Sequence, residues 1–95
     1  MTPALPVDAV RAAIAAEDWT AAGGLLQAHA GAVLAAFPRD ARAFDDASTA
    51  PWRELLARQQ ALAGELRQAR DEAGRALAKL GQDQRGARAW ARALA

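Results

Sequence analysis

Several residue types that build common functional sites are absent or rare in this sequence. It has no cysteine and no tyrosine, and its only histidine is His29. The lack of cysteine excludes a disulfide framework, a thiolate metal site and a cysteine nucleophile. A single imidazole leaves few groups that could serve as acid or base near neutral pH. We therefore expect a binding protein rather than an enzyme, with no cofactor and no bound metal.

Long apolar runs are also missing. A membrane-spanning helix needs about 18 or more consecutive apolar residues, and the sequence has no such run. Its N-terminus lacks the basic region followed by an apolar region that marks a signal peptide. We expect neither a membrane span nor a signal peptide, and the absence of cysteine agrees with a cytoplasmic location.

Large apolar residues are scarcer than the composition suggests. Hydrophobic residues make up 53 % of the 95 residues, but 29 residues are alanine. A chain of this length with so few large side chains builds a marginal core, which a partner or a second copy often completes. Alanine, leucine, arginine, glutamate and glutamine dominate and all favour helices, whereas no strand-like alternation occurs. The prediction is an all-α fold, a small antiparallel helical bundle in a single domain over residues 1–95.

Start and stop signals place the first two helices. A short helix is expected over residues 6–16, because Pro6 suits the first helical position. Asp18 is a suitable N-cap for a second helix over residues 19–37. Pro38 ends that helix, since proline disfavours the α conformation in the residue before it.

The longest helical pattern follows an irregular segment, residues 38–50, which we expect to be a loop. The third helix is predicted to start around Ser48 to Pro51, with a serine or threonine cap and proline in its first turn, and to reach Leu80, with Gly81 as its stop. Its apolar residues recur at heptad spacing over Trp52, Leu55, Leu62, Leu66, Ala69, Ala73, Ala76 and Leu80. Such a helix is about 45 Å long and the second about 28 Å, so a hairpin of the two leaves the far end of the third helix uncovered.

The last segment, residues 81–95, is predicted to be a short amphipathic helix or a mobile tail. Trp90 and Leu94 would share its apolar side. The charges are distributed unevenly, because residues 1–50 carry three arginines against six acids, whereas residues 75–95 carry five cations against one acid. No helix-turn-helix pattern and no aromatic residues between the basic ones accompany these cations, so we expect no nucleic-acid binding.

The polar residues that could suggest chemistry have structural explanations. His29 lies at the edge of the second helix's apolar face, and no second histidine or cysteine could join it in a metal site. The acidic pairs Glu17-Asp18 and Asp45-Asp46 lack an enclosed site that would separate their pKa values. We interpret His29 as structural and the acids as capping or solvated groups.

The order of the motifs resembles one known family, the FliT-type flagellar export chaperones. The resemblance rests on Glu17-Asp18-Trp19 leading into Leu25-Leu26, on Leu55-Leu56, Gln59, Leu62, Glu65-Leu66 and Arg70 in a long helix, and on Arg85-Gly86 and Ala89-Trp90 near the end. In that family the last aromatic residue is usually tyrosine, where this chain has Trp90.

This resemblance implies a cytoplasmic chaperone that binds a secreted flagellar subunit, such as the filament-cap protein, and escorts it to the export ATPase components. Such a chaperone holds an amphipathic client helix in a groove. The candidate binding residues are Leu62, Leu66, Ala69, Ala73 and Leu77 in the third helix and Trp90 and Leu94 in the last segment. The last segment is expected to cover the groove in the free protein and to move aside for the client.

The alternative is a self-associating scaffold or adaptor, a homodimer in which the third helices pair, with no role in export. Gln59 and the alanines of the heptad pattern would weaken a strict coiled coil. The sequence therefore leaves the oligomeric state open.

Overall fold

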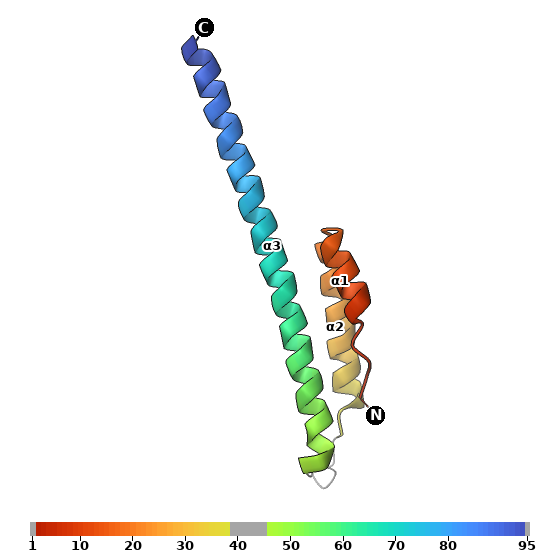
Figure 1. Ribbon diagram of the computed structural model, residues 1–95. Helices are drawn as coiled ribbons and strands as arrows, with labels where there is room; N and C mark the ends of the chain where they lie inside the picture. The colour runs from red at the N-terminus through yellow and green to blue at the C-terminus, as the bar shows by residue number, and fades with distance from the viewer. Residues whose placement is uncertain (1, 39–45, 95) are drawn as a thin grey trace.

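The computed structural model describes residues 2–38 and 46–94, which form three helices (Figure 1). They are α1 (Val7–Ala15), α2 (Trp19–Ala36) and α3 (Asp46–Leu94). Neither described range contains a strand, so the prediction of an all-α fold is confirmed. In Figure 1 the chain runs upward through α1, downward through α2 and upward again through α3.

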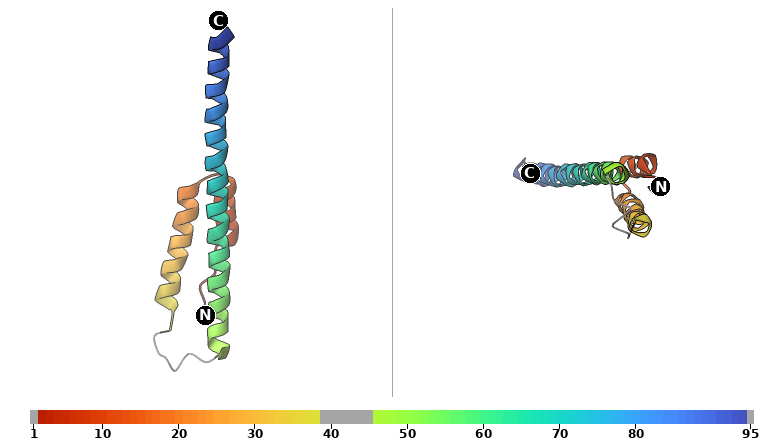
Figure 2. Two further views of the ribbon diagram at one scale, coloured as in Figure 1. Left: turned by 90° about the vertical axis from the view of Figure 1, so that its left-hand side faces the viewer. Right: turned by 90° about the horizontal axis from the view of Figure 1, so that it is seen from below.

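The molecule is long and thin, with principal extents of 78 × 20 × 18 Å. α3 alone has 49 residues and is about 73 Å long, whereas the 18 residues of α2 span about 27 Å. Both shorter helices lie beside the first part of α3, and its second part extends beyond them (Figures 1 and 2). We call residues 2–38 and 46–73 the body, and residues 74–94 the overhang. All overhang residues except Gly81 are exposed.

The turn between α1 and α2 is fixed by hydrogen bonds. The carboxylate of Asp18 accepts from the backbone N–H of Ala21 at 3.1 Å, which confirms the predicted N-cap of α2. The backbone N–H of Asp18 donates to the carbonyl of Ala13 at 2.9 Å, and that of Glu17 to Ile14 at 3.0 Å, as in a Schellman motif. Glu17 has φ 56°, where glycine is usual, at a cost of roughly 1 kcal/mol.

α3 starts at Asp46, two residues before the predicted range of Ser48 to Pro51, so the prediction of a loop up to residue 50 was wrong. Residues 46–50, which were expected in the loop, are helical, and Pro51 lies inside the helix. Because proline has no N–H, the carbonyl of Ala47 lacks the usual donor four residues later. Residues 39–45, the remainder of the expected loop after Pro38, lie outside the described residues.

The predicted end of α3 was also wrong. Gly81 does not stop the helix, and residues 81–94 continue it rather than form a separate segment. A glycine that ends a helix usually adopts positive φ, and none of the glycines in the described ranges does so. Inside a helix, glycine costs only about 1 kcal/mol relative to alanine, and the residues on both sides of Gly81 are mostly strong helix formers.

The hydrophobic core lies where the three helices of the body meet. Val10 of α1, Ala22 of α2 and Leu62 of α3 are buried together, and Leu55 is buried nearer to the start of α3. Partly buried side chains pack around this cluster, among them Leu5, Val7, Ile14, Leu25, Leu26 and Leu66. Only four hydrophobic residues of the described ranges are buried, in agreement with the scarcity of large apolar residues in the sequence.

Candidate partner-binding surface

One face of α3 continues from the body into the overhang. Leu62 and Leu80 are separated by about five helical turns, so their side chains leave the helix in nearly the same direction. α1 and α2 cover that direction in the body, where Leu62 is 3 % exposed. Leu80 lies beyond both helices and is 54 % exposed. The face of α3 that contributes to the core in the body is therefore exposed in the overhang.

The overhang carries four large apolar side chains along this face. Leu77, Leu80, Trp90 and Leu94 are 70 %, 54 %, 68 % and 69 % exposed, and we call them the overhang stripe. At about 100° per residue, all four lie within about 80° of the direction of Leu80. They span more than four helical turns, so the stripe is long enough to contact a second helix along its length.

Five cationic side chains lie on the overhang outside the overhang stripe. They are Arg75, Lys79, Arg85, Arg88 and Arg92, all exposed. Each leaves the helix at about 80° or more from the direction of Leu80. Asp83 is the single acid of the overhang, which gives this part of α3 a net charge of +4. Asp83 and Gln84 leave the helix at about 60° and 40° from Leu80, so polar residues separate Leu77 and Leu80 from Trp90 and Leu94 within the stripe.

The residues predicted to bind a partner fall into two groups. Leu62 is buried in the core and Leu66 is partly buried against it. The prediction that these two leucines line an open surface was wrong, because α1 and α2 already cover them. Ala69 and Ala73 are partly buried where the body ends.

The other predicted residues, Leu77, Trp90 and Leu94, are exposed on the overhang. The expectation that the last segment covers a groove in the free protein was wrong, since the overhang points away from the body (Figure 1). Leu80 was missing from the predicted site although its heptad position had been recognised. Had the heptad count been carried past Gly81, it would have joined Leu80 to Trp90 and Leu94 in one stripe.

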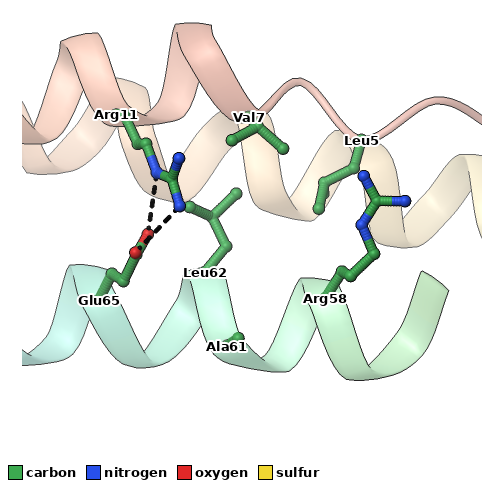
Figure 3. A pocket seen from close by; sticks show the side chains of 7 residues that line it. All are labelled: Leu5, Val7, Arg11, Arg58, Ala61, Leu62 and Glu65. Atoms are coloured by element: carbon green, nitrogen blue, oxygen red, sulfur yellow. Dashed lines mark hydrogen bonds and ion pairs between the residues drawn. The ribbon is translucent and has the colours of Figure 1, made fainter. Parts of the chain in front are cut away.

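A shallow groove runs between α1 and α3 (Figure 3). Leu5 and Val7 line it from the N-terminal side of the chain, and Leu62 lines it from α3. Arg11 and Glu65 bridge it through two hydrogen bonds, Nη2 to Oε1 at 3.1 Å and Nε to Oε2 at 3.3 Å. The hydrogen bond to Glu65 is the largest cause that raises the pKa of Arg11. This pair holds α1 on α3 and crosses the space that a ligand would need.

A second groove lies between the end of α2 and the start of α3, and we call it the basal groove. Phe37 and Trp52 meet there edge to face, with ring centroids 5.2 Å apart. The groove is lined by Phe37, Thr49, Trp52, Arg53 and Leu56. Phe37 and Leu56 are exposed large hydrophobic residues. The body therefore also has an open apolar area, at the end opposite to the overhang.

His29 has a structural role. It is 5 % exposed, its Nδ1 lies 2.8 Å from Oε1 of Gln59, and its Nε2 lies 3.4 Å from the carbonyl oxygen of Pro3. The imidazole thus ties the N-terminal segment and α2 to α3. It also explains why a glutamine occupies position 59 of the heptad pattern. In the sequence, His29 and Gln59 are each a polar residue within the apolar face of a helix, and this shared feature could have predicted that they contact each other.

The acidic residues of the described chain do not gather into a metal site. Among the described residues, no cluster of three or more histidine, aspartate or glutamate side chains could hold a metal ion. Glu17 and Asp18 serve the exposed turn between α1 and α2, and Asp45 lies outside the described residues. None of the described helices is long and apolar enough to cross a membrane.

Comparisons of the chain with models of protein families, with curated proteins and with solved structures gave no match. The resemblance to the flagellar export chaperones therefore rests on the motifs of the sequence, and the binding surface rests on the geometry of α3.

Proposed function

We propose that this chain is a non-enzymatic cytoplasmic chaperone that binds an amphipathic helix of a partner protein on the overhang stripe. The partner that the sequence resemblance implies is a secreted flagellar subunit of the filament-cap type, which the chaperone would deliver to the export ATPase components. The observation that carries the proposal is the exposure of Leu77, Leu80, Trp90 and Leu94 on one face of a helix.

Exposed apolar residues of this size need a reason. Single leucines are common on protein surfaces, whereas an aligned apolar surface often marks an interaction site. The overhang stripe can hold an amphipathic helix that places its own apolar residues three and four positions apart, as in other helix-groove complexes. The net charge of +4 on the overhang would attract a client that carries acidic residues.

The test is binding of a purified filament-cap protein to the full chain, measured by isothermal titration calorimetry. The variant Leu80→Glu removes one of the four large apolar side chains of the stripe and places a second carboxylate near Asp83, and we expect its affinity for the client to fall at least about tenfold, because burying an unpaired charge is costly. Circular dichroism would show an unchanged helix content, since Leu80 contributes nothing to the core of the body.

The matched control is Gln82→Glu. It introduces the same charge two residues away, on an exposed position about 160° from Leu80 around the helix. We expect this variant to bind the client like the parent chain. Absence of binding by the parent, or equal loss in both variants, would contradict the proposal.

Removal of residues 81–95 gives a second test. The overhang carries the stripe and does not cover the body, so a chain that ends at Leu80 loses Trp90 and Leu94 and should bind the client more weakly. Tighter binding by the shortened chain would mean that the last segment inhibits binding.

A further inference from the structure

The two parts of the molecule have opposite charge. The overhang has a net charge of +4, and the whole chain has +1, so the remainder of the chain carries −3. Exposed acids of the body include Asp8 on α1, Glu17 in the turn, and Glu65 and Glu72 on α3. Opposite charges of this size favour contact between the overhang of one copy and the body of another.

The lengths of the two parts also match. The overhang has 21 residues and is about 31 Å long. If a second copy lies antiparallel, with its residue 74 level with residue 73 of the first, its residue 94 is level with residue 53. Trp90 and Leu94 then reach the level of Trp52 and Leu56 in the basal groove. The exposed apolar residues at the tip of one copy and at the base of the other come to the same height.

We infer that the free chain forms an antiparallel homodimer in which the overhang of each copy lies along the body of the other. The overhang then supplies a fourth helix to a body of three helices with a small core. Each end of the dimer becomes a four-helix arrangement, and the twofold axis passes near residues 73 and 74 of α3. The inference concerns the free protein and does not depend on the client, which would compete for the overhang stripe.

The contact area agrees with this arrangement. A helix about 31 Å long and about 10 Å wide presents roughly 300 Å² in projection. Because each copy offers both an overhang and a body, the dimer buries about four such surfaces, or roughly 1,200 Å², which is at the lower end of stable interfaces. A dimer in which only the two overhangs pair would bury about half of this area and bring two charges of +4 together.

Sedimentation equilibrium of the full chain without any client tests for the dimer. We expect a reversible monomer–dimer equilibrium that shifts toward monomer when the salt concentration rises, because part of the attraction is between opposite charges. A chain that stays monomeric throughout the micromolar range overturns the inference. If vesicles containing anionic lipid bind that monomer, a membrane surface is the occupant instead.

Spin labels on introduced cysteines test the arrangement, since the sequence has no cysteine of its own. Ala57→Cys in one sample and Ala89→Cys in another provide exposed labelling positions on the body and on the overhang. In the mixed antiparallel dimer the two labels lie within about 20 Å of each other. Antiparallel pairing of the overhangs alone would separate them by about 33 Å, and a parallel dimer by about 48 Å. Each labelled variant alone gives about 47–50 Å in the proposed dimer, so the inference is overturned when mixing the two samples produces no new short distance.

A charge variant separates attraction by charge from apolar contact. In the proposed register Arg75 and Lys79 lie level with residues 72 and 68 of the other copy, near the exposed Glu72 and Glu65. Replacing Arg75 and Lys79 with glutamate reverses the charge of this part of the overhang and leaves the overhang stripe intact. We expect the dimer dissociation constant to rise at least about tenfold. The control replaces Arg75 with lysine, which keeps both positive charges, and should retain the dimer. A dimer that survives the glutamate variant unchanged contradicts the role of charge complementarity.

Discussion

The same face of α3 is buried in the body and exposed in the overhang. In the body, Leu62 meets Val10 and Ala22 and is almost fully buried. In the overhang, Leu80 occupies the equivalent position about five turns later and is 54 % exposed. The two leucines differ in neither residue type nor helix face. They differ only in whether α1 and α2 are long enough to reach them.

This comparison shows what a heptad pattern specifies. The pattern predicts which side of a helix is apolar, but the lengths of the neighbouring helices decide where that side is buried. α2 has 18 residues and covers α3 only from the base to the level of the turn between α1 and α2 (Figure 1). The remaining apolar positions on α3 are then available to a helix from another molecule.

The largest difference should appear when each leucine is shortened. Leu62→Ala leaves a cavity in a small core, and we expect a loss of about 2–5 kcal/mol in the free energy of unfolding. Leu80→Ala removes the same atoms from the open part of the same face and should change it by less than about 0.5 kcal/mol. Urea denaturation followed by circular dichroism, at concentrations where the chain is monomeric, measures both. Equal effects would mean that the overhang is covered in the monomer.

The caps of the body should matter less than its core and more than surface acids of the overhang. Asp18→Ala removes the acceptor for the N–H of Ala21, and we expect a loss of about 1 kcal/mol. Asp18→Asn keeps a capping oxygen and should be nearly neutral. Asp83→Ala removes an exposed acid from the middle of the overhang and should not lower the urea midpoint. If Asp83→Ala were as costly as Asp18→Ala, the overhang would be part of the cooperative unit.

Glycine substitutions should separate global from local stability. Gly64→Ala in the body and Gly81→Ala in the overhang each improve helix propensity by up to about 1 kcal/mol. The new methyl groups meet only arginine side chains, at 4.0 Å from Nη2 of Arg67 and 3.7 Å from Nη1 of Arg85. We expect Gly64→Ala to raise the urea midpoint. Gly81→Ala should leave the midpoint unchanged and slow amide hydrogen exchange in the overhang by up to about fivefold.

The sequence predicted the parts of the fold that depend on strong local signals. Asp18 caps α2 as expected, and α2 ends within one residue of the predicted position before Pro38. These signals act through backbone geometry that few other interactions can override. The same kind of signal failed at Gly81, because a glycine stops a helix only when it adopts positive φ.

The residue that does adopt positive φ in the described chain is Glu17, and its residue type gives no hint of it. There the demands of the turn between α1 and α2 outweigh a local cost of roughly 1 kcal/mol. The candidate site was likewise only partly predictable from local sequence signals. Leu77, Trp90 and Leu94 could be found from the pattern, whereas the burial of Leu62 and Leu66 depends on how α1 and α2 pack, which a one-dimensional pattern does not contain.

The smallest effect is expected at the ion pair that ties α1 to α3. Arg11 and Glu65 form two hydrogen bonds, but their side chains are 60 % and 47 % exposed, so water and salt screen their attraction. A double-mutant cycle with Arg11→Ala and Glu65→Ala should give a coupling smaller than the loss at Asp18→Ala, and smaller still in high salt. Because Glu65 raises the pKa of Arg11, this stabilisation is complete below the ordinary arginine pKa and is lost only in strongly alkaline solution. Titration of Arg11 should therefore add no pH dependence to stability between about pH 6 and 9. A coupling as large as the effect of Leu62→Ala would mean that α1 is held to α3 by charge rather than by the core. The body and the overhang would then differ because the body has an ion pair between helices, and not because its leucines are buried.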